Sequence, residues 1–195
     1  MLIYITRHGE TVANLEGLLP TPGVELTERG RAQSALVAAY FQGKPIDAIY
    51  CSNQKRCVVS SGPISHVTGA PLIVYPSLRD MDYGAFGGKS FSEREVDDAI
   101  DRINAREPGY RFPGGGNFFD LEKRVASGLG RILHSGKDGV VIVSHRDTNK
   151  VIIRKLLAPY KREARGLDFG HTDIYQFDTQ SGLLFESNPV RLRDI

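Results

Sequence analysis

Short apolar runs that alternate with helical patterns are the feature that most constrains the fold of this 195-residue chain. The clearest run is Val140–Ser144, whose β-branched residues are typical of a strand that is covered on both faces. Alternation of strands and helices favours a mostly parallel sheet, because parallel neighbours need a crossover connection. The other runs predicted as strands are Leu2–Thr6, Ile46–Cys51, Pro71–Tyr75 and a final strand or hairpin formed by Thr172–Phe177 and Leu183–Glu186. The sequence therefore predicts an α/β fold.

Helical periodicity predicts what lies between these runs. The predicted helices are Thr27–Gln42, a segment that begins near Ser52 or Asn53, and Thr148–Leu157. Thr27 can cap the first of them, and Gly43 follows its end. Gly62 and Pro63 should kink or break the second helix, because proline has no amide N–H to continue the hydrogen-bond ladder.

A long segment, Gly84–Gly139, interrupts the alternation. It holds two helical patterns, Ser90–Ile103 and Asn117–Leu133, joined through the glycine-rich stretch Pro113–Gly116. The first pattern opens with Ser-Phe-Ser-Glu, the sequence of a capping box. We predict a single domain over residues 1–195, with this segment, at about 84–139, as a helical insert that covers the sheet edge like a lid.

Length, charge and cysteine content limit the partners and the compartment. A net charge of +2 gives no large basic face, so we expect neither nucleic acid nor a membrane as partner. The chain has no apolar stretch long enough to cross a bilayer and no basic lead at its N-terminus, so a cytoplasmic location is expected. Two cysteines, Cys51 and Cys57, are too few for a zinc site or a disulfide framework, and we expect both to be buried as small apolar residues.

Polar side chains follow the predicted strands where ligands bind in open α/β sheets, at the carboxyl ends. They are Arg7, His8, Arg56, Asp80 and His145. Taken singly, each has an ordinary structural interpretation as a solvated arginine, a structural histidine or a turn aspartate. Together they predict a phosphate pocket, because guanidinium groups match phosphate oxygens and a neutral imidazole can act as a nucleophile.

The segment Arg7-His8-Gly9-Glu10-Thr11-x-x-Asn14 resembles the R-H-G-x-[ST]-x-x-N signature of the histidine phosphatase superfamily, which includes phosphoglycerate mutases and small bacterial phosphatases. Further segments are similar to family motifs in the same order: Leu26–Gln33, Ser52–Cys57, Leu78–Gly88 and Val143–His145. The resemblance implies a three-layer α/β/α, phosphoglycerate mutase-like fold. It also implies that the insert lies over the carboxyl edge of the strands.

Site roles follow from the same resemblance. It implies that His8 becomes phosphorylated, that Arg7, Arg56 and His145 hold the phosphoryl group, and that Asn14 supports the pocket. It assigns the proton donor to a position where this chain has aspartate and the family usually has glutamate. With an ordinary pKa of about 3.9, an aspartic acid must be buried or face a charged substrate to carry a proton at neutral pH.

The residue at this position is Asp80. Because its side chain is one methylene shorter than that of glutamate, Asp82 is the other candidate for the proton donor. The alternative interpretation of Asp82 is a structural one, in a turn or a helix cap. Arg146 stands where the family usually has glycine after the second histidine, and it either contacts an acidic group of the substrate or points to solvent. Tyr83 belongs to the aromatic residues near the insert, which either contact the substrate or pack the core.

The expected function is that of a metal-independent phosphomonoesterase that hydrolyses a small phosphorylated metabolite through a phosphohistidine, with no cofactor. One alternative is phosphoryl transfer of the phosphoglycerate mutase type, which the compact insert disfavours. Another is a non-catalytic phosphate-binding regulatory protein, and a homodimer is left open. A metal site made of His8, Asp80 and His145 is disfavoured, because Arg7 and Arg56 would repel a cation.

Overall fold

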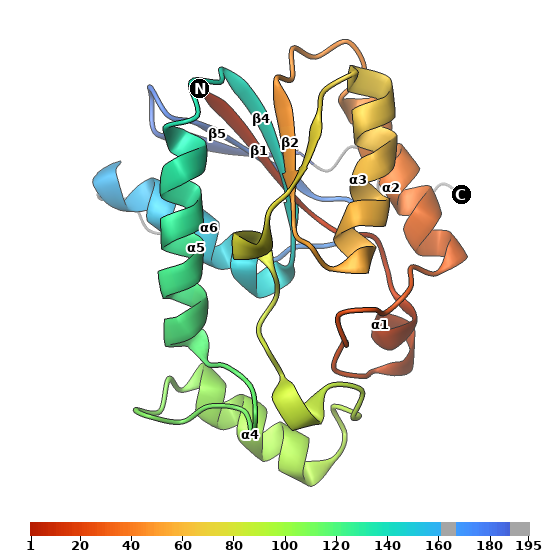
Figure 1. Ribbon diagram of the computed structural model, residues 1–195, viewed down its shortest axis with the longest axis vertical. Helices are drawn as coiled ribbons and strands as arrows, with labels where there is room; N and C mark the ends of the chain where they lie inside the picture. The colour runs from red at the N-terminus through yellow and green to blue at the C-terminus, as the bar shows by residue number, and fades with distance from the viewer. Residues whose placement is uncertain (161–166, 188–195) are drawn as a thin grey trace.

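The computed structural model describes residues 1–160 and 167–187, and its central element is a six-stranded sheet of order β3-β2-β4-β1-β5-β6 (Figure 1). The strands are β1 (Leu2–Arg7), β2 (Ala48–Cys51), β3 (Leu72–Val74), β4 (Gly139–Ser144), β5 (Ile174–Asp178) and β6 (Leu183–Ser187). The first four strands run parallel to one another, whereas β5 is antiparallel to β1 and forms a hairpin with β6. The predictions of a mostly parallel sheet and of a final hairpin are confirmed.

Helices lie on both faces of this sheet and beyond the carboxyl ends of its strands (Figure 1). They are α1 (Val12–Glu16), α2 (Glu28–Tyr40), α3 (Lys55–Thr68), α4 (Arg94–Asn104), α5 (Phe118–Leu133) and α6 (Arg146–Leu157), with single 3-10 turns η1 (Pro76–Leu78), η2 (Gly84–Phe86) and η3 (Ala158–Tyr160). Helices α2 and α3 lie on one face, α5 and α6 lie on the other, and α4 lies beyond the carboxyl ends of the strands (Figure 1). The predicted three-layer α/β/α fold is therefore confirmed. No helix in the described part of the chain could span a bilayer.

Alternation of side chains along the strands divides the core in two, because successive residues of a strand point to opposite faces. On β1, Ile3 and Ile5 belong to a core cluster that also includes residues of α4, α5 and α6, whereas Tyr4 belongs to a second cluster with residues of α2 and α3. Cys51 and Cys57 are free thiols buried in the second of these clusters, as predicted. Burial of both faces explains why β4 is apolar along almost its whole length.

Helix α3 corrects one prediction. It begins at Lys55, later than expected, and it runs through Pro63 without a break. Cys57 and Ile64, which lie on either side of the proline, are both buried against the sheet. Packing of the two halves on one core therefore outweighs the single backbone hydrogen bond that proline removes.

Helix α4 also begins later than its sequence pattern predicts, at Arg94 rather than at Ser90. Only half of the expected capping box forms there. The Ser90 N–H donates to Oε1 of Glu93 at 2.8 Å, but the Ser90 hydroxyl accepts from the N–H of Ser92 at 3.2 Å. The serine is therefore used in a turn that precedes the helix, and the helix starts after it.

The helix after β4 begins earlier than predicted. His145 is the N-cap of α6, so Arg146 is already helical, whereas the apolar pattern suggested a start at Thr148. The short helix α1 was not predicted, and a capping box between Thr11 and Asn14 starts it. Both differences arise at strand ends, where caps rather than apolar periodicity set the helix start.

Candidate active site

The pairing of β1 with β4 brings two of the predicted site residues together. Its register aligns Arg7 with Ser144, so His8 and His145 follow at neighbouring positions. The two imidazole rings have centroids 5.2 Å apart and planes inclined by 59°. His8 is 3% exposed and His145 is 1% exposed. Two buried imidazoles thus face each other at the carboxyl end of the sheet.

Hydrogen bonds fix the tautomer of His8. Its Nδ1 lies 2.7 Å from the carbonyl oxygen of Gly9, and a carbonyl can only accept, so Nδ1 carries the proton. The lone pair is then on Nε2, which accepts a hydrogen bond from Nε of Arg56 at 3.2 Å. Burial, followed by the charges of His145, Arg56 and Arg7, holds the pKa of His8 well below its usual value of 6.5. His8 is therefore a neutral imidazole at pH 7, with Nε2 as its nucleophilic atom.

The turn after His8 is fixed by close packing against α2. A Cβ atom on Gly9 would lie 2.1 Å from the carbonyl oxygen of Gly30, so only glycine fits at this position. The Gly9 N–H donates to the Ser60 hydroxyl of α3 at 3.0 Å. Helices α2 and α3 therefore both position the backbone that carries the imidazole.

Arg56 connects His8 to the predicted acid. Its side chain extends from the first turn of α3 and is fully buried. Besides its bond to His8, it donates to the carbonyl oxygen of Thr21 at 3.0 Å and to Oδ2 of Asp80 at 2.9 Å. The other carboxylate oxygen of Asp80 accepts from the N–H of Met81 at 3.0 Å. The guanidinium is thus held in one orientation by three acceptors.

His145 lies next to the Asp80 end of this arrangement and also contacts Ser52. Its Nε2 lies 2.9 Å from the Ser52 hydroxyl, and its Nδ1 lies 3.6 Å from Oδ2 of Asp80. Burial and then the positive charges of Arg56, Arg7 and Arg124 hold the pKa of His145 well below 6.5. This histidine is therefore also neutral at pH 7.

Arg7 and His171 complete the group around His8. Arg7 donates one bond from its guanidinium to the carbonyl oxygen of Phe169 at 3.1 Å, and its buried Nε has no hydrogen-bond partner among the described residues. The Nδ1–H of His171 donates to the carbonyl oxygen of His8 at 2.7 Å, and the two rings are 5.7 Å apart. Burial, with the charge of Arg7, lowers the pKa of His171 to about 4. Sequence analysis missed His171, because no local pattern links it to a residue 163 positions earlier.

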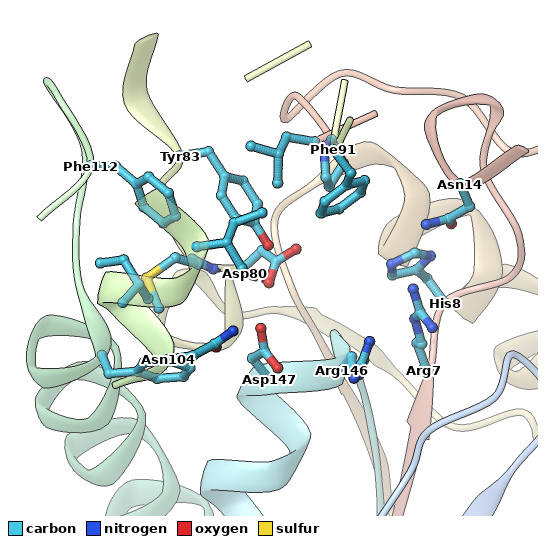
Figure 2. A pocket seen from close by; sticks show the side chains of 16 residues that line it. Arg7, His8, Asn14, Asp80, Tyr83, Phe91, Asn104, Phe112, Arg146 and Asp147 are labelled. Carbon is cyan, nitrogen blue, oxygen red and sulfur yellow. Dashed lines mark hydrogen bonds between the residues drawn. The ribbon is translucent and has the colours of Figure 1, made fainter. Parts of the chain in front are cut away.

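A cavity of about 200 Å³ opens in front of these residues (Figure 2). One end is polar and includes Arg7, His8, Asn14 and Asp80. The rest of the wall is largely apolar and comes mainly from the insert and its flanking segments: Leu19, Met81, Phe91, Ile100, Ile103, Phe112 and Phe118. Arg56 and His145 are buried and do not line the cavity, but Arg56 contacts His8 and His145 lies next to Asp80.

The predicted contact residues differ in their placement. Asp82 is exposed, lies outside this cavity and accepts a bond from the N–H of Gly84 at 3.1 Å, which is the turn role that was its alternative. Tyr83 and Arg146 do line the cavity, although the Arg146 side chain is 56% exposed and its Nε lies 3.7 Å from Oδ1 of Asp168. Asp147 lines the cavity as well and was not among the predicted site residues.

The chemistry of this site is that of an anion pocket. Across residues 1–160 and 167–187, no group of three or more histidine, cysteine, aspartate or glutamate side chains is arranged to hold a metal ion. What the polar end offers is guanidinium N–H groups beside a nucleophilic nitrogen, an arrangement suited to a phosphoryl group.

Comparison with known proteins agrees with this chemistry. A family model described as the histidine phosphatase superfamily (branch 1) matches residues 3–185. The chain belongs to the histidine phosphatase superfamily. Among curated relatives, this histidine phosphatase is 30% identical to a putative phosphoserine phosphatase 2 from Hydrogenobacter thermophilus, over 77% of this chain and 76% of that protein. It is 28% identical to an adenosylcobalamin/alpha-ribazole phosphatase from Salmonella typhimurium, over 80% of each chain.

Solved structures show the same fold. A mycobacterial glucosyl-3-phosphoglycerate phosphatase in complex with VO3 superposes with a TM-score of 0.78 at 21% identity, over 95% of this chain and 96% of that one. Family membership and the named relatives together identify the protein as a phosphatase of the histidine phosphatase type. The phosphoglycerate mutase-like fold expected from the motifs is confirmed.

Proposed function

We propose that this histidine phosphatase hydrolyses phosphomonoesters by forming a phosphohistidine on Nε2 of His8. The observation that carries the proposal is the fixed, neutral state of that ring: Nδ1–H is bound to Gly9, so the reactive lone pair is on Nε2, which accepts a bond from Arg56 until it attacks phosphorus at the polar end of the cavity. In the first step, Nε2 attacks phosphorus as the bond from phosphorus to the ester oxygen breaks.

Positive side chains around His8 would hold the transferred group. The unpartnered Nε of Arg7 and the guanidinium of Arg56 can each donate to a phosphoryl oxygen, and His145 lies on the adjacent strand end. Such donors neutralise charge that spreads over the phosphoryl oxygens during transfer, and phosphoryl transfer needs little beyond that and positioning. Asn14, which lines the cavity, supports the loop after His8 through its bonds to Thr11.

In the second step, water attacks phosphorus, the nitrogen–phosphorus bond breaks and inorganic phosphate leaves. Each step moves one proton: to the ester oxygen as the alcohol departs, and from water as phosphate forms. Asp80 is the carboxyl that the family motif supplies for this transfer. It faces the cavity while accepting hydrogen bonds on both oxygens.

Substrates are proposed from the shape of the cavity. A polar end that binds phosphate and a wall with several aromatic and aliphatic side chains suit a monoester whose alcohol has an apolar part. The relatives named after phosphoserine and alpha-ribazole phosphate make those two esters the first compounds to assay.

Trapping of the intermediate tests the mechanism. Protein mixed with a ³²P-labelled monoester and quenched in base should carry label on His8, and the label should be released by acid, as expected for a phosphoramidate. His8→Asn should carry no label and release no phosphate. Active wild-type protein that never carries label, or an active His8→Asn variant, would exclude the phosphohistidine.

A mutase is separated from a hydrolase in the same assay. A hydrolase releases inorganic phosphate from a panel of monoesters at the rate at which the alcohol appears, and it needs no bisphosphorylated activator. Conversion of 3-phosphoglycerate to 2-phosphoglycerate only when 2,3-bisphosphoglycerate is added would favour the mutase instead.

A further inference from the structure

We infer that Asp147, in the first turn of α6, binds an ammonium group on the alcohol part of the substrate, so that the preferred substrates are phosphomonoesters of amino alcohols. The inference rests on the proposed function, because it names the substrate class of the same cavity. Recognition of the alcohol is separate from phosphoryl transfer, whose nucleophile and proton donor stay as proposed. The basis is an unpartnered carboxyl group in the wall of an anion-binding cavity (Figure 2).

Asp147 does not act as a helix cap, although its position would allow it. Acidic side chains are common in the first turn of a helix, where free backbone N–H groups and the helix dipole favour a negative charge. His145 is the N-cap of α6, and Asp147 is the second residue of that helix. Within residues 1–160 and 167–187, however, the Asp147 carboxyl accepts no hydrogen bond and forms no ion pair. Figure 2 shows it pointing into the cavity, where it can bind a ligand.

The protein compensates the charge of this carboxyl only in part. Burial is the main reason why the pKa of Asp147 is raised above its ordinary value, and the negative charge of Asp80 adds to the shift. Arg146 and Lys150 on α6 and Arg7 on β1 act in the other direction without reversing it. A positively charged group of a ligand would lower this pKa again, because it would stabilise the carboxylate.

A carboxylate in this cavity disfavours phosphoesters of neutral alcohols. It repels the phosphoryl dianion that every substrate brings, and this repulsion is stronger in a partly buried cavity than in bulk water. An ammonium group on the alcohol would replace the repulsion with an attraction to the same carboxylate. Charge complementarity therefore favours a cationic alcohol over a neutral one of equal size.

Two further hydrogen-bond acceptors line the same cavity. They are the Tyr83 hydroxyl and the Asn104 side-chain amide, and neither has a hydrogen-bond partner in the described part of the chain. The Tyr83 hydroxyl is neutral, because burial and then the charges of Asp80 and Asp147 hold its pKa well above its usual value of 10. In Figure 2 the side chains of Asn104 and Asp147 point toward the same part of the cavity. An ammonium has three N–H donors, and the carboxylate, the amide oxygen and the hydroxyl can each accept one.

The remaining wall suits the carbon chain of such an alcohol. It is mainly apolar and includes Met81, Ile100 and Ile103, which can contact the methylene groups between the ester oxygen and the ammonium. The cavity volume of about 200 Å³ favours an alcohol of a few carbon atoms.

Esters of nearly equal size test the inference in the wild-type protein. 2-Aminoethyl phosphate, 2-hydroxyethyl phosphate and propyl phosphate differ only in the end group, which is an ammonium, a hydroxyl or a methyl. The 3-aminopropyl, 3-hydroxypropyl and butyl esters repeat the comparison with one more methylene. At the better of the two lengths, kcat/KM for phosphate release should be about 10- to 100-fold higher for the ammonium ester than for the methyl-ended ester, the size expected for one charge-assisted hydrogen bond. The hydroxyl ester should lie between the two.

Asp147→Asn should remove this preference. It should lower kcat/KM for the ammonium ester by about 10- to 100-fold, and it should leave that for the methyl-ended ester unchanged or higher, because the repulsion is also removed. Loss of a merely structural residue would lower both values. Asp147→Glu keeps the charge and should retain part of the preference. The matched control is Asp101→Asn, which removes an exposed carboxylate from α4 and should keep the preference of the parent.

The possible outcomes separate this inference from the proposed function. A preference for the ammonium ester that disappears in Asp147→Asn supports ammonium recognition. A wild-type protein that prefers the hydroxyl ester, or that shows no preference for ammonium at either length, overturns it while the phosphohistidine proposal stands. An unchanged preference in Asp147→Asn, or an equal loss on all three esters, also overturns it. Failure of the wild-type protein to release phosphate from any monoester, p-nitrophenyl phosphate included, or full activity of His8→Asn, overturns the proposed function itself.

Discussion

His171 should make the folded protein sensitive to acid. Burial lowers its pKa to about 4, whereas an imidazole in the unfolded chain titrates near 6.5. As the pH falls below 6.5, the unfolded state therefore binds a proton that the folded state does not, and stability falls until the pH passes the folded pKa of about 4. Between pH 7.5 and pH 5.5 this one ring should lower the free energy of unfolding by about 1.4 kcal/mol.

Urea unfolding at the two pH values measures this loss. His171→Asn keeps an N–H near the position of Nδ1, which now donates to His8, but it does not titrate. The variant should therefore lose about 1.4 kcal/mol less than the parent between pH 7.5 and pH 5.5. His66→Asn is the matched control, because it removes an exposed imidazole from α3. An equal loss of stability in the His171→Asn variant and the parent would refute the reasoning.

Three further perturbations test the packing and the charges. Gly9→Ala should destabilise the protein by about 1–3 kcal/mol or more in urea unfolding, since its Cβ would meet the Gly30 carbonyl, whereas Gly130→Ala, with open space around it, should not destabilise it. Arg56→Met should lower the free energy of unfolding by about 3–5 kcal/mol, because it leaves the Asp80 carboxylate buried without its ion-pair partner. Adding Asp80→Asn to this variant should restore part of the lost stability. EDTA should leave the rate of phosphate release unchanged, and a loss that added Mg²⁺ or Zn²⁺ reverses would contradict a metal-independent mechanism.

Much of this architecture could be predicted from local patterns. The β-branched run of β4 and the helical spacing of α2 and α5 correspond to elements of the structure within a few residues. The arrangement of His8, Arg56 and His145 could be anticipated because the carboxyl ends of parallel strands meet at one edge. In these cases the sequence pattern and the tertiary environment favour the same structure.

The remaining features depend on contacts between distant segments. Pro63 is tolerated because both halves of α3 pack on the sheet, which no propensity can indicate. His171 lies in the described segment before β5 and is placed by its contact with His8 at the end of β1, and its role has no sequence motif. Asp147 follows directly after Arg146, yet only the structure shows that its carboxyl faces the cavity while the arginine side chain is largely in solvent.

The alignment of β1 with β4 has a consequence for how such a protein can diversify. The separation of His8 and His145 is set by backbone hydrogen bonds between the adjacent central strands β1 and β4, so it does not depend on the length of the α4 segment that lies between these strands in the chain. Much of the opposite wall comes from α4 and the loops beside it. Mutations, insertions and deletions in that wall can therefore change which alcohol is accepted while the reacting atoms keep their geometry.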